Sequence, residues 1–265
     1  MKTALAQINC AVGDVKSNCA RISEYAKRAA NDGCDIVIFP EMSDTGYVPS
    51  IIKDTASSWP GLPYSTCCDA ASDNNIYLIC GLSEREGDSI FNSAGVFSPE
   101  GGLIGKYRKT HLFPADPINE NLCFKPGNSL TTVEIGGVIF GLTICYDLRF
   151  PEIYRGLALK GAQVLVNCSA WPETRAAHWE ALSRARAIEN QEYFLGANRI
   201  GKDGKVPFCG RSCIIEPWGD YAAVGSAENE ELVIGEIDIK KIESFRKKVP
   251  VFKSRRPDIY GGLIK

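Results

Sequence analysis

Residues 139–152 read IFGLTICYDLRFPE, and this stretch indicates how the chain is built. An apolar run ends abruptly at Cys145, polar residues follow, and Pro151 starts a predicted helix that ends near Gly161. Residues 163–167 then form a second short apolar run, typical of a strand buried on both faces. The stretch therefore predicts a strand–helix–strand unit.

The rest of the chain combines such units with tight hairpins. Gly- and Pro-containing turns separate paired strand patterns at 91–97 and 103–109, 131–135 and 138–144, and 212–216 and 221–224. A mixed α/β fold, with a sheet or a pair of sheets covered by helices, fits this pattern and leaves the strand order open. We expect one domain over residues 1–265, in which 240–265 form a C-terminal tail.

Composition excludes several classes of protein. The 265 residues carry 30 Lys and Arg against 32 Asp and Glu, a net charge of −2, which argues against a nucleic-acid-binding protein. No run of 18 apolar residues predicts a membrane span, and the N-terminus lacks a signal-peptide pattern. Eleven cysteines, an odd number, and only two histidines argue against a disulfide framework or a zinc site. We therefore expect a cytoplasmic protein with reduced thiols, no metal, and neither nucleic acid nor membrane as partner.

Cys145 is the first candidate for catalysis. It follows a buried strand and precedes the helix that begins at Pro151, so we expect the helix dipole to lower the pKa of its thiol. The backbone N–H of Tyr146 is then placed to face the oxygen of an attacked carbonyl group. Taken alone, this segment equally fits one more buried cysteine among eleven.

Two other apolar runs also end in charged residues. Glu41 follows the run 36–39, where burial raises the pKa of a carboxyl group enough for it to act as a base. Lys109 lies in the basic segment 106–111 after a hairpin strand. Taken singly, Glu41 fits a cap or a salt bridge and Lys109 a solvated sheet edge, but together with Cys145 they form a complete set for acyl transfer.

The same three segments resemble the signature motifs of the nitrilase superfamily, the carbon–nitrogen hydrolases. The motifs are FPE at 39–41, YRKTHLF at 107–113 and ICYDLRFPE at 144–152, in the order and approximate spacing of that family. The resemblance continues through HWEALSRARAIENQ at 178–191, ANRIG at 197–201 and IIEPWG at 214–219. It thus covers the whole chain.

This resemblance implies a four-layer α-β-β-α sandwich that forms homodimers or higher homo-oligomers through helices at 151–160 and 174–191. It implies that Glu41 is the general base, Lys109 the oxyanion stabiliser and Cys145 the nucleophile, with no metal or organic cofactor. Glu120, in ENLCFKPG at 120–127, matches the family's second glutamate, although Cys123 stands where relatives often carry Tyr.

The residues after the nucleophile resemble the amidase branches, which include ω-amidases and deaminated-glutathione amidases, whereas nitrile-cleaving members generally carry Cys-Trp-Glu. A small amide, most simply an ω-monoamide of a (2-oxo) dicarboxylic acid, is the expected substrate; an N-carbamoyl amine or a nitrile are the alternatives. Arg149 or Arg175 is expected to bind the substrate carboxylate, and Tyr47 and Trp171 to form the pocket wall. Arg149 equally fits a salt bridge with Glu152 or another local acid.

Two further alternatives differ in mechanism. His111 lies two residues after Lys109, so an extended strand directs both the same way and a Cys–His hydrolase is conceivable. The family resemblance instead makes His111, like His178, a structural hydrogen-bonding residue. A non-catalytic member that kept only the fold is disfavoured by the intact set Glu41, Lys109 and Cys145.

Overall fold

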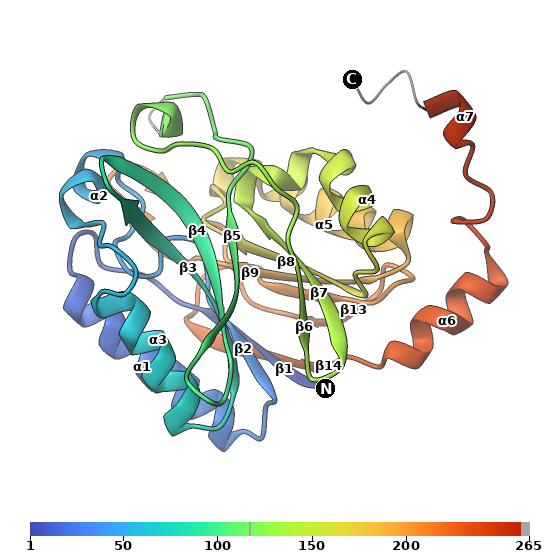
Figure 1. The fold of residues 1–265 in the computed structure, drawn as a ribbon, viewed down its shortest axis with the longest axis horizontal. Helices are drawn as coiled ribbons and strands as arrows, with labels where there is room; N and C mark the ends of the chain where they lie inside the picture. Colours follow the sequence, from blue (N-terminus) through green and yellow to red (C-terminus); the bar gives the residue numbers. More distant parts are fainter. Residues whose placement is uncertain (117, 261–265) are drawn as a thin grey trace.

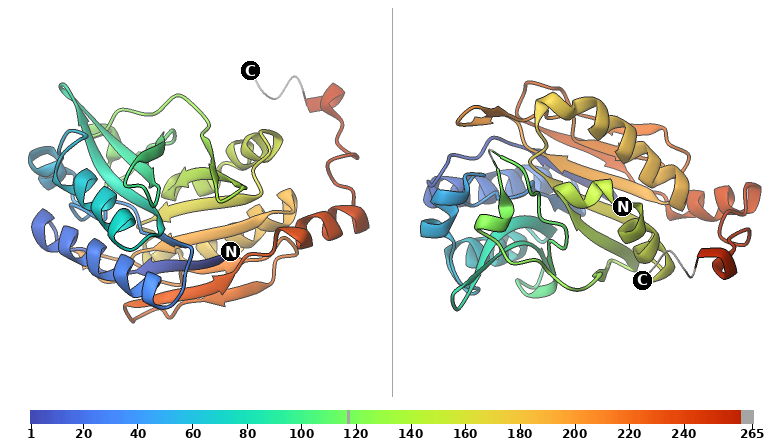
Figure 2. Two further views of the ribbon diagram at one scale, coloured as in Figure 1. Left: turned by 60° about the horizontal axis from the view of Figure 1, so that its bottom comes forward. Right: turned by 90° about the horizontal axis from the view of Figure 1, so that it is seen from above.

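The structure of the chain is a computed structural model that describes residues 1–116 and 118–260. Its main elements are two six-stranded mixed sheets stacked face to face, with helices on both outer faces (Figures 1 and 2). The helices are α1 (Val15–Asn31), α2 (Pro49–Thr55), α3 (Leu62–Asp73), α4 (Pro151–Leu159), α5 (Ala176–Asn190), α6 (Ile239–Lys248) and α7 (Pro257–Tyr260). This arrangement confirms the predicted four-layer α-β-β-α sandwich.

In the first sheet, the first and last strands of the chain lie side by side at one edge, and a hairpin lies at the other edge. Its order is β14 (Glu231–Glu236), β1 (Lys2–Gln7), β2 (Ile36–Ile38), β3 (Tyr77–Glu86), β4 (Ser89–Phe97) and β5 (Leu103–Arg108). Strands β1, β2 and β3 run parallel, and the remaining neighbours are antiparallel. The predicted hairpin at 91–97 and 103–109 is therefore the β4–β5 pair.

The second sheet repeats this plan. Its order is β13 (Tyr221–Val224), β12 (Cys213–Ile215), β9 (Tyr193–Asn198), β8 (Val164–Ser169), β7 (Val138–Ile144) and β6 (Thr132–Ile135). Strands β7, β8 and β9 are parallel, joined through α4 and α5, and hairpins lie at both ends. The strand–helix–strand unit and both predicted hairpins of this half are confirmed.

Packing of apolar faces holds the layers together. Leu5, Ile38 and Tyr107 of the first sheet belong to one buried cluster with Phe140 and Leu142 of the second. A separate buried cluster joins α1 and α3 to the outer face of the first sheet. The N-terminus of α1 is capped by Asp14, whose carboxylate accepts a hydrogen bond from the backbone N–H of Ser17, and Gly33 follows the helix with φ +73°.

Several short elements were not predicted from the sequence, among them α2, the 3₁₀ helix η1 (Glu120–Leu122), and the hairpin of β10 (Lys202–Asp203) and β11 (Val206–Pro207). Each is too short to show a periodic pattern, and α2 and η1 have no side-chain cap at their N-termini. All eleven cysteines are free thiols. None of the described helices is long and apolar enough to cross a membrane.

Candidate active site

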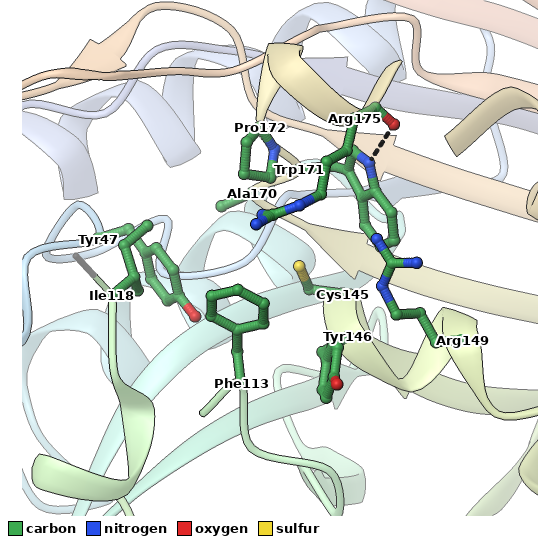
Figure 3. Close-up of a pocket in the computed structure, with 10 residues that line it drawn as sticks. All are labelled: Tyr47, Phe113, Ile118, Cys145, Tyr146, Arg149, Ala170, Trp171, Pro172 and Arg175. Atoms are coloured by element: carbon green, nitrogen blue, oxygen red, sulfur yellow. Dashed lines mark hydrogen bonds between the residues drawn. The ribbon is translucent and has the colours of Figure 1, made fainter. Parts of the chain in front are cut away.

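Cys145 lies at a strained turn between β7 and the 3₁₀ helix η2 (Cys145–Arg149). Its φ angle is +42°, a conformation that costs a non-glycine residue free energy and therefore needs support from its surroundings. Asp147 provides that support, because its Oδ2 accepts a hydrogen bond of 2.9 Å from the backbone N–H of Ile144. The turn presents the Cys145 sulfur, in a residue only 8% exposed, to a pocket at the ends of the strands (Figure 3).

Glu41, Lys109 and Glu120 form a buried cluster beneath this pocket. The Lys109 Nζ lies 2.8 Å from Glu41 Oε1 and 2.8 Å from Glu120 Oε2, and all three side chains are fully buried. Glu41 Oε2 also accepts a hydrogen bond from the backbone N–H of Ala170, at 2.9 Å. The cluster joins residues that follow β2 and β5 to the loop that carries η1, so the structure brings the predicted charged residues together.

Burial and the neighbouring charges together set the pKa values of Glu41 and Lys109. Burial raises the pKa of Glu41, although the ammonium of Lys109 opposes that shift. Burial alone would lower the pKa of Lys109, but the carboxylates of Glu120 and Glu41 outweigh it and raise that pKa. Lys109 is therefore held as a cation, while the carboxyl group of Glu41 holds a proton more readily than an exposed glutamate does.

The expected lowering of the Cys145 pKa is wrong. Burial, and next the charge of Glu41, raise the pKa of the thiol, and the opposing effects of Lys109 and a hydrogen bond from Ser169 are smaller. The sequence argument relied on the dipole of α4, but Cys145 begins the short helix η2 and lies a full turn before α4. The thiol therefore needs a base to remove its proton.

Asn92 is a member of this cluster that the sequence analysis missed. Its Nδ2 donates hydrogen bonds to Glu41 Oε1 at 2.7 Å and to Glu120 Oε1 at 3.0 Å. The sequence held no usable signal for it, because the β4–β5 pairing shifts by one residue between Val96 and Phe97, and only the structure shows that Asn92 lies opposite Lys109. Residues directly opposite on antiparallel strands point to the same face of the sheet.

The pocket above Cys145 is narrow, mostly apolar and partly open to solvent (Figure 3). All four residues predicted to bind substrate line it. The lining residues are Tyr47, Phe113, Ile118, Cys145, Tyr146, Arg149, Ala170, Trp171, Pro172 and Arg175. A narrow, mostly apolar site with a few polar groups suits a small molecule rather than a polymer.

Two guanidinium groups lie at this pocket without a carboxylate partner. Arg149 stacks 5.0 Å above the ring of Trp171, and Arg175 lies 5.1 Å from the ring of Phe113. Among the ion pairs of residues 1–116 and 118–260 neither arginine appears, so the alternative of a salt bridge to Glu152 is wrong. Burial, followed by the charge of Arg175, lowers the pKa of Arg149, as expected for two neighbouring cations.

Neither histidine approaches the thiol as a catalytic partner. His111 Nδ1 lies 2.8 Å from Asp147 Oδ1, and its ring stacks on Phe150 at 3.8 Å between centroids. His178 Nδ1 lies 3.2 Å from Arg149 Nη2 at the rim of the pocket. Among the described residues no cluster of three or more His, Cys, Asp and Glu side chains could hold a metal ion.

The amino-acid sequence was compared with those of known protein families and proteins. The sequence model of the carbon-nitrogen hydrolase family matches residues 2–247. The chain belongs to the carbon–nitrogen hydrolases. It is 35% identical to omega-amidase NIT2 of Homo sapiens over 97% of this chain and 96% of the relative.

Solved structures of carbon–nitrogen hydrolases agree with the fold. A carbon-nitrogen hydrolase from Helicobacter pylori G27 superposes with a TM-score of 0.94 at 25% identity, covering 100% of this chain and 98% of the other. A mutant amidase from Nesterenkonia sp. AN1, with acrylamide added to its active-site cysteine, has a TM-score of 0.84 at 27% identity over 94% and 98% of the two chains. The chain is thus a nitrilase-superfamily enzyme that hydrolyses non-peptide C–N bonds, with amidases among its relatives.

Proposed function

We propose that this carbon–nitrogen hydrolase converts an ω-monoamide of a (2-oxo) dicarboxylic acid into the dicarboxylate and ammonia. The observation that carries the proposal is the pair Arg149 and Arg175, two guanidinium groups at the pocket of Cys145 that have no acidic partner among the described residues. An unneutralised pair of cations favours a substrate that brings its own negative charge.

The first half-reaction acylates the enzyme. Glu41 accepts the proton of the Cys145 thiol as the sulfur attacks the amide carbon, because the raised pKa of the thiol leaves little thiolate in advance. Lys109 and the N–H of Tyr146 stabilise the oxygen that becomes negative. The C–N bond then breaks, Glu41 returns its proton to the nitrogen, and ammonia leaves a thioester on Cys145.

The second half-reaction frees the enzyme. Glu41 removes a proton from water as the water attacks the thioester carbon, and the C–S bond breaks to release the carboxylic acid and the thiol. Glu120 positions Lys109 in both steps: its carboxylate binds Nζ at 2.8 Å and is itself held by the backbone N–H of Phe113 at 2.6 Å. Neither half-reaction needs a metal or an organic cofactor.

The remote end of the substrate meets the two arginines. A carboxylate forms paired hydrogen bonds with guanidinium groups, and the aromatic rings of Trp171 and Phe113 hold those groups in place. The carbonyl of Arg175 accepts a hydrogen bond of 2.8 Å from the Trp171 indole, which also fixes the loop between them. A neutral aliphatic amide lacks these contacts and is expected to bind more weakly.

Ammonia release from a substrate panel tests the proposal. The panel contains a 2-oxoglutaramate-type ω-monoamide, deaminated glutathione, a simple aliphatic amide, an N-carbamoyl amine and a nitrile, each with wild type and Cys145→Ala. We expect the highest kcat/KM with the ω-monoamide and no turnover by Cys145→Ala. Carbon dioxide release would point to the N-carbamoyl amine, and preference for deaminated glutathione or the nitrile would equally overturn the substrate assignment.

Arginine variants test the binding role separately from the chemistry. For Arg175→Met and Arg149→Met we expect KM for the ω-monoamide to rise about 10- to 100-fold, with little change for the aliphatic amide. Arg28→Met, which removes an exposed arginine on α1, is the matched control for charge. Equal effects on both substrates would contradict carboxylate binding by these arginines.

We also propose that the chain forms a homodimer in the cytoplasm. Leu159 at the end of α4 and Ile188 on α5 are exposed apolar side chains, and Val249 in the C-terminal segment is another. That segment projects from the body beside α4 (Figure 1). Sedimentation of wild type and Leu159→Glu tests the dimer, which the substitution is expected to weaken; sedimentation of wild type as a monomer would contradict it.

A further inference from the structure

Asn92 is a neutral side chain that bridges the two buried carboxylates of the active site. It lies on β4, is 1% exposed, and uses both hydrogens of its amide, one for Glu41 and one for Glu120. Its backbone carbonyl also accepts a hydrogen bond of 2.8 Å from the N–H of Lys109. Asn92 therefore contacts all three charged residues of the cluster.

The charge balance of the cluster explains why such a donor matters. Glu41 and Glu120 carry two negative charges when ionised, and Lys109 supplies one positive charge. Two buried carboxyl groups that share a single cation tend to retain a proton between them. A neutral donor to both carboxylates favours their ionised forms without adding a further charge.

The other end of the Asn92 amide supports this reading. Its Oδ1 is buried and has no hydrogen-bond partner among the described residues. A reversed amide would satisfy neither carboxylate and would place the oxygen against both, so the two acids determine its orientation. The site tolerates an unpaired oxygen because the two N–H donations are made at the same time.

We propose that Asn92 is a positioning residue that keeps Glu41 and Glu120 anionic together, so that Glu41 is free to accept the proton of Cys145. This inference rests on the proposed function, because it assigns Glu41 the role of base. Asn92 does not line the pocket, and it acts on the reaction only through the two carboxylates.

The pH dependence of the reaction is the property that Asn92 should control. Groups that face Glu41 from the surrounding elements are Lys109, Glu120, Cys145, Tyr47, Cys168 and Arg199. Burial raises the pKa of Glu41 most, Lys109 lowers it, Glu120 raises it, and the hydrogen bond from Asn92 adds a smaller lowering. Loss of the Asn92 donor therefore moves the acid limb of activity to higher pH.

The experiment compares Asn92→Leu, Asn92→Ser and Ser93→Ala with wild type. Leucine has a similar size and donates nothing, whereas serine retains one donor. Ser93→Ala is the matched control, because the Ser93 hydroxyl is a buried donor on the same strand that contacts Glu84 instead. The readouts are kcat/KM for ammonia release and the rate at which iodoacetamide alkylates Cys145, followed on the Cys145 peptide by mass spectrometry from pH 4 to 9.

We expect the acid limb of Asn92→Leu to move up by about one to two pH units in both readouts. We expect kcat to fall at least about 10-fold at pH 6, KM to change little, and Asn92→Ser to lie between wild type and Asn92→Leu. An unshifted acid limb in Asn92→Ser, or in a folded Asn92→Leu, overturns the proposal, as does an equal shift in Ser93→Ala. Alkylation of Cys145 needs no amide substrate. If the wild type is alkylated but releases no ammonia, the proposed substrate is contradicted, and the effect of Asn92 on the pH dependence can still be measured by alkylation.

Discussion

Gly81 packs against the backbone that carries Glu41. Replacing Gly81 by alanine should displace Glu41 and lower activity, although Gly81 is not itself in the active site. Gly81 lies in the middle of β3, next to β2 in the sheet. A Cβ atom at this position would lie 2.4 Å from the carbonyl oxygen of Pro40 and 2.7 Å from the Cα of Glu41. Both obstacles are backbone atoms, so no side-chain rotation relieves the clash.

The required displacement can be worked out from these distances. Ordinary contact begins at 3.4 Å, so the segment at Pro40 must move by 3.4 − 2.4, about 1 Å. The N–H of Ser43 also binds the Gly81 carbonyl at 2.8 Å, which ties the two segments together and restricts other ways of relaxing. A misplacement of about 1 Å costs on the order of 100-fold in rate, and overpacking costs about 1–3 kcal/mol of stability.

Steady-state kinetics and thermal unfolding measure these two effects. We expect Gly81→Ala to lose about 100-fold in kcat while remaining folded at 25 °C. Gly102→Ala is the matched control, because its Cβ would meet nothing closer than the Ser98 hydroxyl oxygen at 3.9 Å. Wild-type kcat in Gly81→Ala, or an equal loss in Gly102→Ala, would refute the reasoning.

Two further predictions concern charge. Lys109→Met should lower kcat about 10²–10³-fold, and His111→Ala less than about 10-fold; the reverse order in steady-state assays would favour a Cys–His mechanism. Glu192, fully buried beside Arg246, has its pKa raised by burial from 4.5 to about 8. Its folded state therefore retains a proton that the unfolded chain has released between those values, so stability falls as pH rises through this window by up to about 1.4 kcal/mol per pH unit. Urea unfolding at pH 5 to 9 should show a shallower decline for Glu192→Gln, and an unchanged slope would argue against the shift.

Local patterns predicted the regular elements because each pattern lies within a short segment. The turn at 98–102 predicted the β4–β5 hairpin, and Pro151 and Gly161 bracketed α4. Local patterns could not predict the pairing of β1 with β14. Leu5 pairs with Val233, and most of the chain separates these two residues in sequence. Short elements such as α2 were missed because seven residues, about two helical turns, are too few to show a clear period.

The candidate site divides in the same way. The sequence marked Glu41, Lys109 and Cys145 as candidates, because a charged or reactive residue that interrupts an apolar run is visible in sequence, and the structure brings them together. Asn92 was missed because an asparagine inside a strand is unremarkable until Glu41 and Glu120 are seen on either side of it. The direction of the Cys145 pKa was also wrong, because burial and the nearby Glu41 outweigh a local dipole.

By itself, the sequence determined most of the strands and helices, the candidate residues for the chemistry, and the resemblance to the carbon–nitrogen hydrolases. These properties follow from periodicity, turn residues and motif chemistry, all of which act over a few neighbouring positions. Only the tertiary structure decided the strand order, the protonation of the thiol, and the unpaired state of Arg149 and Arg175. These properties depend on burial and on charges that the fold brings together from distant parts of the chain. Electrostatic free energies change steeply over a few ångströms, and no local sequence pattern contains those distances.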